Sequence, residues 1–60
     1  MEAKAEYRLM VEIIREAVLA AANWAMALRE PGRAGGFAKL ARKHSAKVAA
    51  LALQLHSRPA

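Results

Sequence analysis

The chain has 60 residues, of which 57% are hydrophobic, and it contains no cysteine. A lone chain of this size buries only about 60% of the surface that it exposes when unfolded, so its core is marginal. Without cysteine, neither a disulfide framework nor a thiolate metal site can compensate, and association with another chain is the remaining common remedy. Alanine accounts for 16 residues and β-branched residues are few, which disfavours a sheet protein.

Charge is distributed unevenly between the two halves of the chain. Residues 1–30 hold four basic and five acidic side chains, whereas residues 31–60 hold six basic and no acidic ones. A second half with a net charge of +6 favours an anionic partner. A solvated basic face that only keeps the protein in solution is the alternative.

The most apolar stretch, residues 17–28, is twelve residues long. A membrane-spanning helix needs about 20 apolar residues, so a membrane partner is not favoured. The first sixteen residues hold four Glu against three basic residues, which is not typical of a secretory signal or a transit peptide. We therefore expect a cytoplasmic protein.

The sequence predicts two helices in one all-α domain that covers residues 1–60. Strong helix formers fill the first stretch, which predicts a helix over about residues 3–29. Pro31 and three glycines then interrupt the pattern, so we expect a turn over residues 30–36. A second helix follows over about residues 37–56. So short a connection implies an antiparallel hairpin.

The first predicted helix has more apolar surface than one neighbour can cover. Its large apolar side chains span an arc of roughly 200°, about twice the width that one partner helix needs. The polar arc holds Lys4, Arg8, Glu12, Arg15, Glu16 and Asn23. The second helix has a single narrow stripe, made of Phe37, Leu40, Ala41, His44, Val48, Leu51 and Leu55.

We expect the excess apolar surface of the first helix to be covered by a second copy, because two-fold homodimers are the commonest oligomers. Two hairpins would then form a homodimeric four-helix bundle. The predicted dimer interface consists of Met10, Ile13, Ile14, Ala17, Val18, Ala21, Trp24 and Leu28. A monomeric hairpin and a fragment of a larger protein remain the alternatives.

His44 is the one polar interruption of the second stripe. Its register in a hairpin predicts a position near the level of Trp24. A metal or haem ligand is one interpretation, but a metal site normally needs three or four ligands. A neutral histidine with one hydrogen bond, to Ser45 or to Asn23 of a neighbour, is the favoured one. We therefore predict no metal and no cofactor.

The carboxylates also predict no catalytic site. Glu12 and Glu16 lie beside Arg8 and Arg15 on the polar arc, as ordinary ion pairs of a helix surface. Neither serine has a base at a suitable spacing. We expect a protein that is not an enzyme.

The most informative pattern is a basic one on the second helix. Lys39, Arg42, Lys43 and Lys47 share one helical face over about 12 Å of axis, and Arg33 in the turn extends it. Such an array suits phosphates. Side chains that read bases are nearly absent, so we expect backbone or shape recognition of DNA or RNA, in a regulatory role.

A rival hypothesis uses the wide apolar face of the first helix instead. It makes the chain a protein–protein interaction or assembly module, such as a chaperone-like, antitoxin-like or scaffold hairpin. Binding to an anionic membrane surface ranks lower, because Phe37 is the only bulky aromatic residue of the second helix. An engineered bundle is a further alternative, although regular Glu/Lys surface pairing is lacking.

Overall fold

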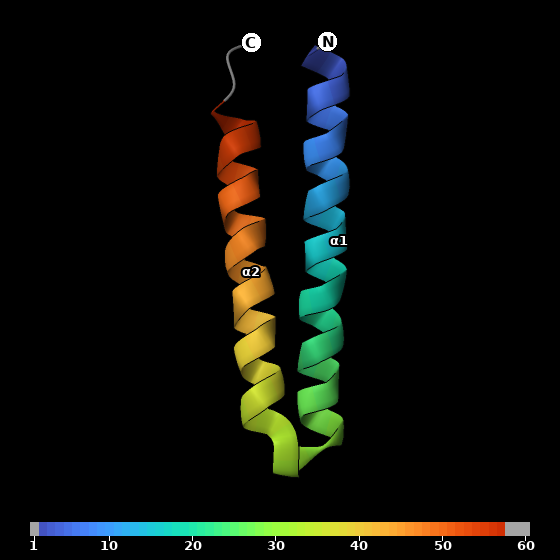
Figure 1. The fold of residues 1–60 in the computed structure, drawn as a ribbon, viewed down its shortest axis with the longest axis vertical. Helices are drawn as coiled ribbons and strands as arrows, with labels where there is room; N and C mark the ends of the chain where they lie inside the picture. The colour runs from blue at the N-terminus through green and yellow to red at the C-terminus, as the bar shows by residue number, and fades with distance from the viewer. Residues whose placement is uncertain (1, 58–60) are drawn as a thin grey trace.

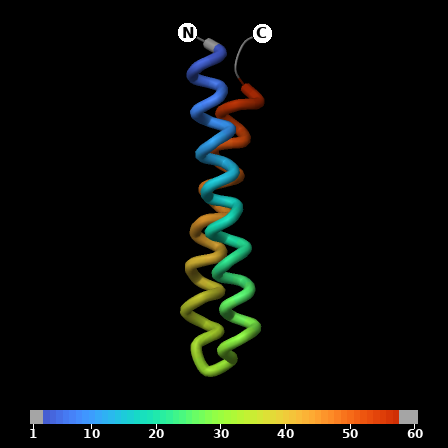
Figure 2. The backbone as a smooth tube through the Cα atoms, turned by 90° about the vertical axis from the view of Figure 1, so that its right-hand side faces the viewer, coloured from blue at the N-terminus to red at the C-terminus, as the bar shows by residue number. Residues whose placement is uncertain are grey.

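The computed structural model describes residues 2–57 as a hairpin of two long helices. Helix α1 spans Glu2–Arg29, a short 3-10 turn η1 spans Pro31–Arg33, and helix α2 spans Ala34–His56. The helices run antiparallel, so that the start of α1 and the end of α2 lie at the same end of the hairpin (Figure 1). The view turned by 90° shows that they cross at a shallow angle (Figure 2). The predicted all-α hairpin is confirmed.

Helix α1 ends where the proline predicts. Glu30, the residue before Pro31, leaves the helix with φ −125° and ψ 79°, because a following proline disfavours helical geometry. Its backbone N–H still donates to the carbonyl of Met26 at 2.9 Å. Arg29 lies in the last turn, where a positive charge complements the helix dipole.

The turn is shorter than predicted, and α2 begins at Ala34 instead of residue 37. The N–H of Ala34 donates to the carbonyl of Pro31, so the 3-10 turn leads directly into the helix. Gly35 and Gly36 adopt helical conformations, and no described glycine has a positive φ. Glycine lowers helix stability by up to about 1 kcal/mol per residue but does not forbid the conformation.

The two helices meet along one heptad-spaced seam on each, with steps that alternate between three and four residues. On α1 the seam consists of Leu9, Ile13, Glu16, Ala20, Asn23 and Ala27, and on α2 it consists of Phe37, Ala41, His44, Val48, Leu51 and Leu55. Every one of these residues is buried or half-buried. This spacing is that of helices packed at a small angle.

The core of the isolated hairpin is small. Among residues 3–57, whose side chains the structure describes, only Ala20, Ala41 and Glu16 are buried. Two alanines at about the same level let the helices approach closely but remove little apolar surface from water. Within the described residues, neither helix offers a stretch that is both long and apolar enough to cross a membrane.

The face of α1 that packs against α2 differs from the expected one. Glu16 and Asn23 were expected on the polar arc, but Glu16 is buried against α2 and Asn23 is half-buried. The seam that includes them also contains Ala20 and Ala27, which allow close approach, and Glu16 finds a polar partner there. Most of the large apolar side chains of α1 are left exposed to solvent.

Candidate functional site

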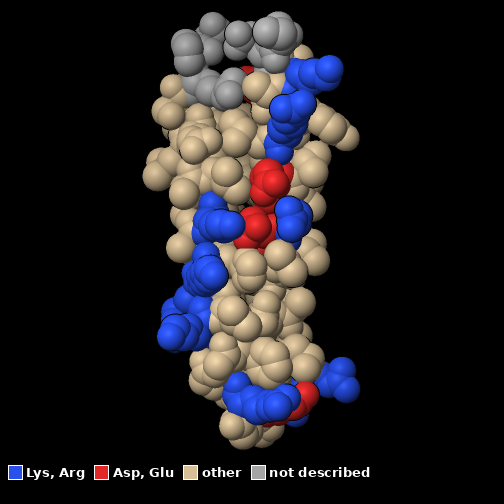
Figure 3. Space-filling view, viewed as in Figure 1, with Lys and Arg blue, Asp and Glu red and all other residues tan. Residues whose placement is uncertain are grey.

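The basic face of α2 consists of Lys39, Arg42, Lys43 and Lys47, and all four side chains are exposed. They point away from the seam that packs against α1, and Figure 3 shows basic side chains in a column along the edge of α2. Within residues 2–57, none of the four forms an ion pair. The structure therefore brings these predicted residues together on one open surface.

Arg33 lies apart from that column. It belongs to η1, and its guanidinium lies 3.9 Å from the carboxylate of Glu30. Both side chains are largely exposed, so the pair is weak and the arginine remains accessible. Arg33 thus marks the turn end of the molecule, and within residues 2–57 it is the one member of the predicted basic site that forms an ion pair.

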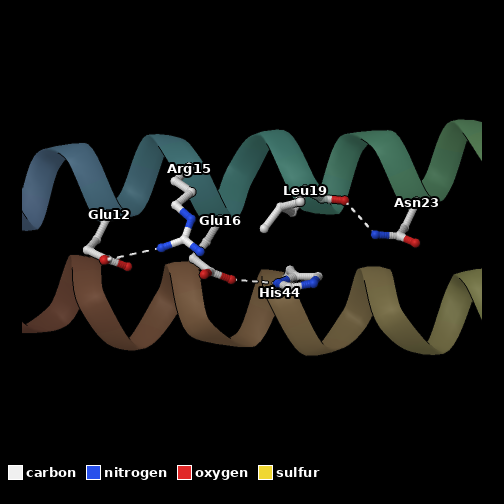
Figure 4. Close-up of polar contacts among 6 residues, drawn as sticks. All are labelled: Glu12, Arg15, Glu16, Leu19, Asn23 and His44. Carbon is white, nitrogen blue, oxygen red and sulfur yellow. Dashed lines mark hydrogen bonds and ion pairs between the residues drawn. The ribbon is translucent and has the colours of Figure 1, made fainter.

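A buried polar pair joins the two helices at mid-length. The Nδ1 atom of His44 lies 2.6 Å from Oε1 of Glu16, and the two side chains retain 21% and 5% of their accessible surface (Figure 4). With the ring N–H as donor, Glu16 accepts a charge-assisted hydrogen bond. Within residues 2–57, no buried side-chain nitrogen or oxygen lacks a hydrogen-bond partner.

The environment of Glu16 lowers the pKa of its carboxyl. The hydrogen bond from His44 is the main cause, and the positive charges of Lys47, His44 and Arg15 act in the same direction. Burial acts in the opposite direction but is outweighed. Glu16 therefore stays ionised at neutral pH although it is buried.

This pair corrects two predictions about His44. Its partner is Glu16, neither Ser45 nor Asn23, and its level is that of Glu16 and not that of Trp24. The turn is shorter than predicted, and this changes which residues of the two helices lie side by side. In the structure the numbers of facing residues add up to about 60, as in Glu16 and His44. Asn23 uses its side chain locally, donating to the carbonyl of Leu19 at 2.8 Å.

The sequence did contain a signal for the Glu16–His44 pair. Glu16 falls in the heptad register of Leu9, Ile13 and Ala20, and His44 falls in that of Ala41 and Val48. The two heptad patterns taken together predict that both side chains lie between the helices. The surface ion pair between Glu12 and Arg15 was predicted and is confirmed, at 3.7 Å.

The titratable residues do not converge on a metal site. In the part of the chain that the structure describes, no three His or acidic side chains come together. Glu16 and His44 alone supply two ligands, fewer than a structural or catalytic site normally needs.

The second candidate surface is the outer face of α1, on the side opposite α2. Of the nine large hydrophobic side chains that the structure exposes, seven lie on this helix. Ile14 is 63% exposed, Val18 61% and Leu28 85%. We define the outer apolar face of α1 by these seven residues, which are Tyr7, Met10, Val11, Ile14, Val18, Trp24 and Leu28.

The outer apolar face overlaps most of the predicted dimer interface. Ala17 and Ala21 are exposed between its larger members. Ile13 is half-buried in the seam with α2 instead. Tyr7 and Val11 were not part of the predicted interface, although they share the heptad spacing of Ile14 and Val18.

Comparisons with protein families, with curated proteins and with solved structures return no match to this chain.

Proposed function

We propose that this protein is a small, non-enzymatic helical hairpin of the cytoplasm that self-associates into a four-helix bundle and binds the phosphate backbone of nucleic acid. The observation that carries the proposal is the basic face of α2, whose four side chains are exposed on one side of one helix. Residues 31–60 contain no acidic side chain, so nothing on α2 opposes an approaching polyanion. A regulatory role through DNA or RNA binding follows.

The chemistry of this face fits phosphates better than base edges. Four cations over about 12 Å of helix can contact successive phosphates. Direct readout needs side chains such as Asn or Gln beside the cations. Asn23 lies on the other helix, and Gln54 lies beyond the basic face, two turns from Lys47. Binding through the backbone or shape of the nucleic acid is therefore proposed, with little dependence on sequence.

Titration of a duplex DNA and of an RNA hairpin at two salt concentrations tests the proposal. If each hairpin neutralises about four phosphates, affinity should fall roughly 100-fold between about 50 and about 200 mM salt. A matched pair of double variants then locates the site. Arg42→Glu/Lys43→Glu reverses two charges of the basic face, and Lys4→Glu/Arg8→Glu reverses two exposed charges of α1.

Both double variants lower the net charge from +5 to +1. Binding should be lost with Arg42→Glu/Lys43→Glu and largely kept with Lys4→Glu/Arg8→Glu. Equal losses would mean that total charge, and not this face, attracts the ligand. Absence of binding at the lower salt concentration would refute nucleic-acid binding altogether.

The outer apolar face of α1 favours a second candidate function, an interaction or assembly module for a different protein. Exposed apolar side chains gathered on one face are typical of a protein-binding surface, and seven large ones lie on α1. This candidate predicts a hairpin that stays monomeric alone and gains stability only with its partner. The oligomeric state of the purified chain separates the two functions.

A further inference from the structure

The outer apolar face of α1 has a regular geometry. Residues 7, 11, 14, 18, 21, 25 and 28 follow one another at alternating steps of four and three, and all are exposed. The same alternation defines the seam that packs against α2, on the other side of the helix. A helix with two opposite heptad seams is built to lie between two neighbours. The hairpin supplies only one of them.

We call these seven positions the outer seam. The outer seam of one copy is complementary in side-chain size to the outer seam of a second copy that runs in the opposite direction. Ala21 and Ala25 lie between Val18 and Leu28, whereas the first half of the seam holds the large side chains Tyr7, Val11 and Ile14. In an antiparallel pair centred on Val18, Val11 faces Ala25 of the partner subunit and Ile14 faces Ala21 of the partner subunit. These layers each join one large and one small residue, Tyr7 faces Leu28 of the partner subunit at either end, and Val18 meets its own copy at the two-fold axis.

A parallel pair lacks this complementarity. It would set Ala21 and Ala25 opposite their own copies, between the paired Val18 and the paired Leu28 side chains, so the two alanine layers would leave space between larger ones. Gaps in a packed interface forfeit dispersion contacts. The position of the two alanines along the seam therefore distinguishes the two directions.

Charge favours the antiparallel direction as well. The seven seam positions carry no charged residue. Reversal brings Arg29 to the level of Glu6 of the partner subunit and sets the two helix dipoles in opposite directions. Parallel alignment would instead bring each Lys4 and each Arg29 to the level of its own copy.

The length of the overlap sets the size of the contact. Residues 7–29 of α1 overlap their copies when the pair is centred on Val18, and this stretch is about 35 Å long and about 10–12 Å wide with its side chains. Two such faces in contact bury roughly 800 Å² in total, which is the size of a small, reversible interface.

From these observations we infer that the outer apolar face of α1 is the docking surface for the same face of a second copy, packed antiparallel about a two-fold axis at Val18. This inference deepens the self-association within the proposed function by naming the surface and its direction. Nucleic-acid binding does not enter the argument.

Cysteine cross-linking tests both the surface and the direction, because the natural chain contains no cysteine. Val18→Cys should form a disulfide with its own copy under mild oxidation. An equimolar mixture of Val11→Cys and Ala25→Cys chains should give mainly the mixed disulfide. Ala46→Cys, which is exposed on α2, is the control and should remain a thiol. Intact mass separates these products.

Each outcome has a distinct meaning. Disulfides of Val11→Cys with itself and of Ala25→Cys with itself, without the mixed product, would show a parallel pair. A chain that sediments as a monomer and does not cross-link at Val18→Cys would overturn the inference. Nucleic-acid binding is measured separately, since none of these cysteines replaces a residue of the basic face. A monomer that still binds DNA would refute this inference alone.

Discussion

At the scale of single residues, Glu16 is the least expected feature of the molecule. A buried carboxylate is tolerated only when its charge is compensated. Glu16 receives that compensation from the hydrogen bond of His44 and from the nearby charges of Lys47 and Arg15. The pair places two polar side chains in seams that are otherwise mainly apolar, and it joins the two helices at one level.

Acid should weaken the hairpin through this one carboxyl. The pKa of Glu16 in the folded protein lies below its ordinary value of 4.5. The stabilisation is therefore complete above that value and is lost as the pH falls through the folded-state pKa. Urea unfolding between pH 6 and pH 3 should show a decline that Glu16→Gln reduces. Glu12→Gln removes an exposed carboxylate and should leave the decline unchanged.

Replacing His44 alone should destabilise the protein more than replacing both Glu16 and His44. His44→Leu leaves an ionised, buried Glu16 without its hydrogen bond, and we expect Tm to fall by several degrees. Glu16→Leu/His44→Leu replaces the polar pair by two apolar side chains and should unfold at or above the Tm of the natural chain. Thermal unfolding followed by circular dichroism checks both variants. A double variant less stable than His44→Leu would contradict this account of the pair.

At the scale of the helices, the sequence predicted the number of helices but not which face of α1 packs against α2. The helix formers on both sides of Pro31 predicted two helices and a hairpin correctly. The orientation of α1 could not be predicted, because apolar side chains cover more than half of its circumference and several heptad registers are possible. The register that packs against α2 contains Glu16 and Asn23. Two polar residues disfavour this register when α1 is considered alone, and the position of His44 beside Glu16 explains it.

The start of α2 offers a second test at this scale. Gly35 and Gly36 are helical, and a Cβ atom added at either would meet nothing within 4 Å. Gly35→Ala/Gly36→Ala should therefore stabilise the protein by about 1 kcal/mol in total, mainly by restricting the unfolded chain. That corresponds to a rise in Tm of roughly 4–8 °C. The reciprocal variant Ala46→Gly, in the middle of α2, should lower Tm by a similar amount.

At the scale of the whole molecule, the hairpin exposes more large apolar side chains than it buries. In the described part of the hairpin the only buried hydrophobic residues are two alanines, so the isolated chain should be marginally stable. If two copies stabilise each other, Tm should rise by several degrees over about a hundredfold increase in protein concentration. Ile14→Ser/Val18→Ser should abolish that dependence. A Tm independent of concentration would indicate a stable monomer.

The antiparallel register, in which Glu16 lies beside His44, also determines the level of the basic face of α2 along α1. Lys43, at the middle of the basic face, lies at the height of Ala17, one residue from the inferred two-fold axis at Val18. Each basic face points away from α1, and α1 would lie between α2 and the partner subunit. The two cationic columns would thus lie at one height on the two outer sides of the pair, so that each column would bind its own stretch of polyanion.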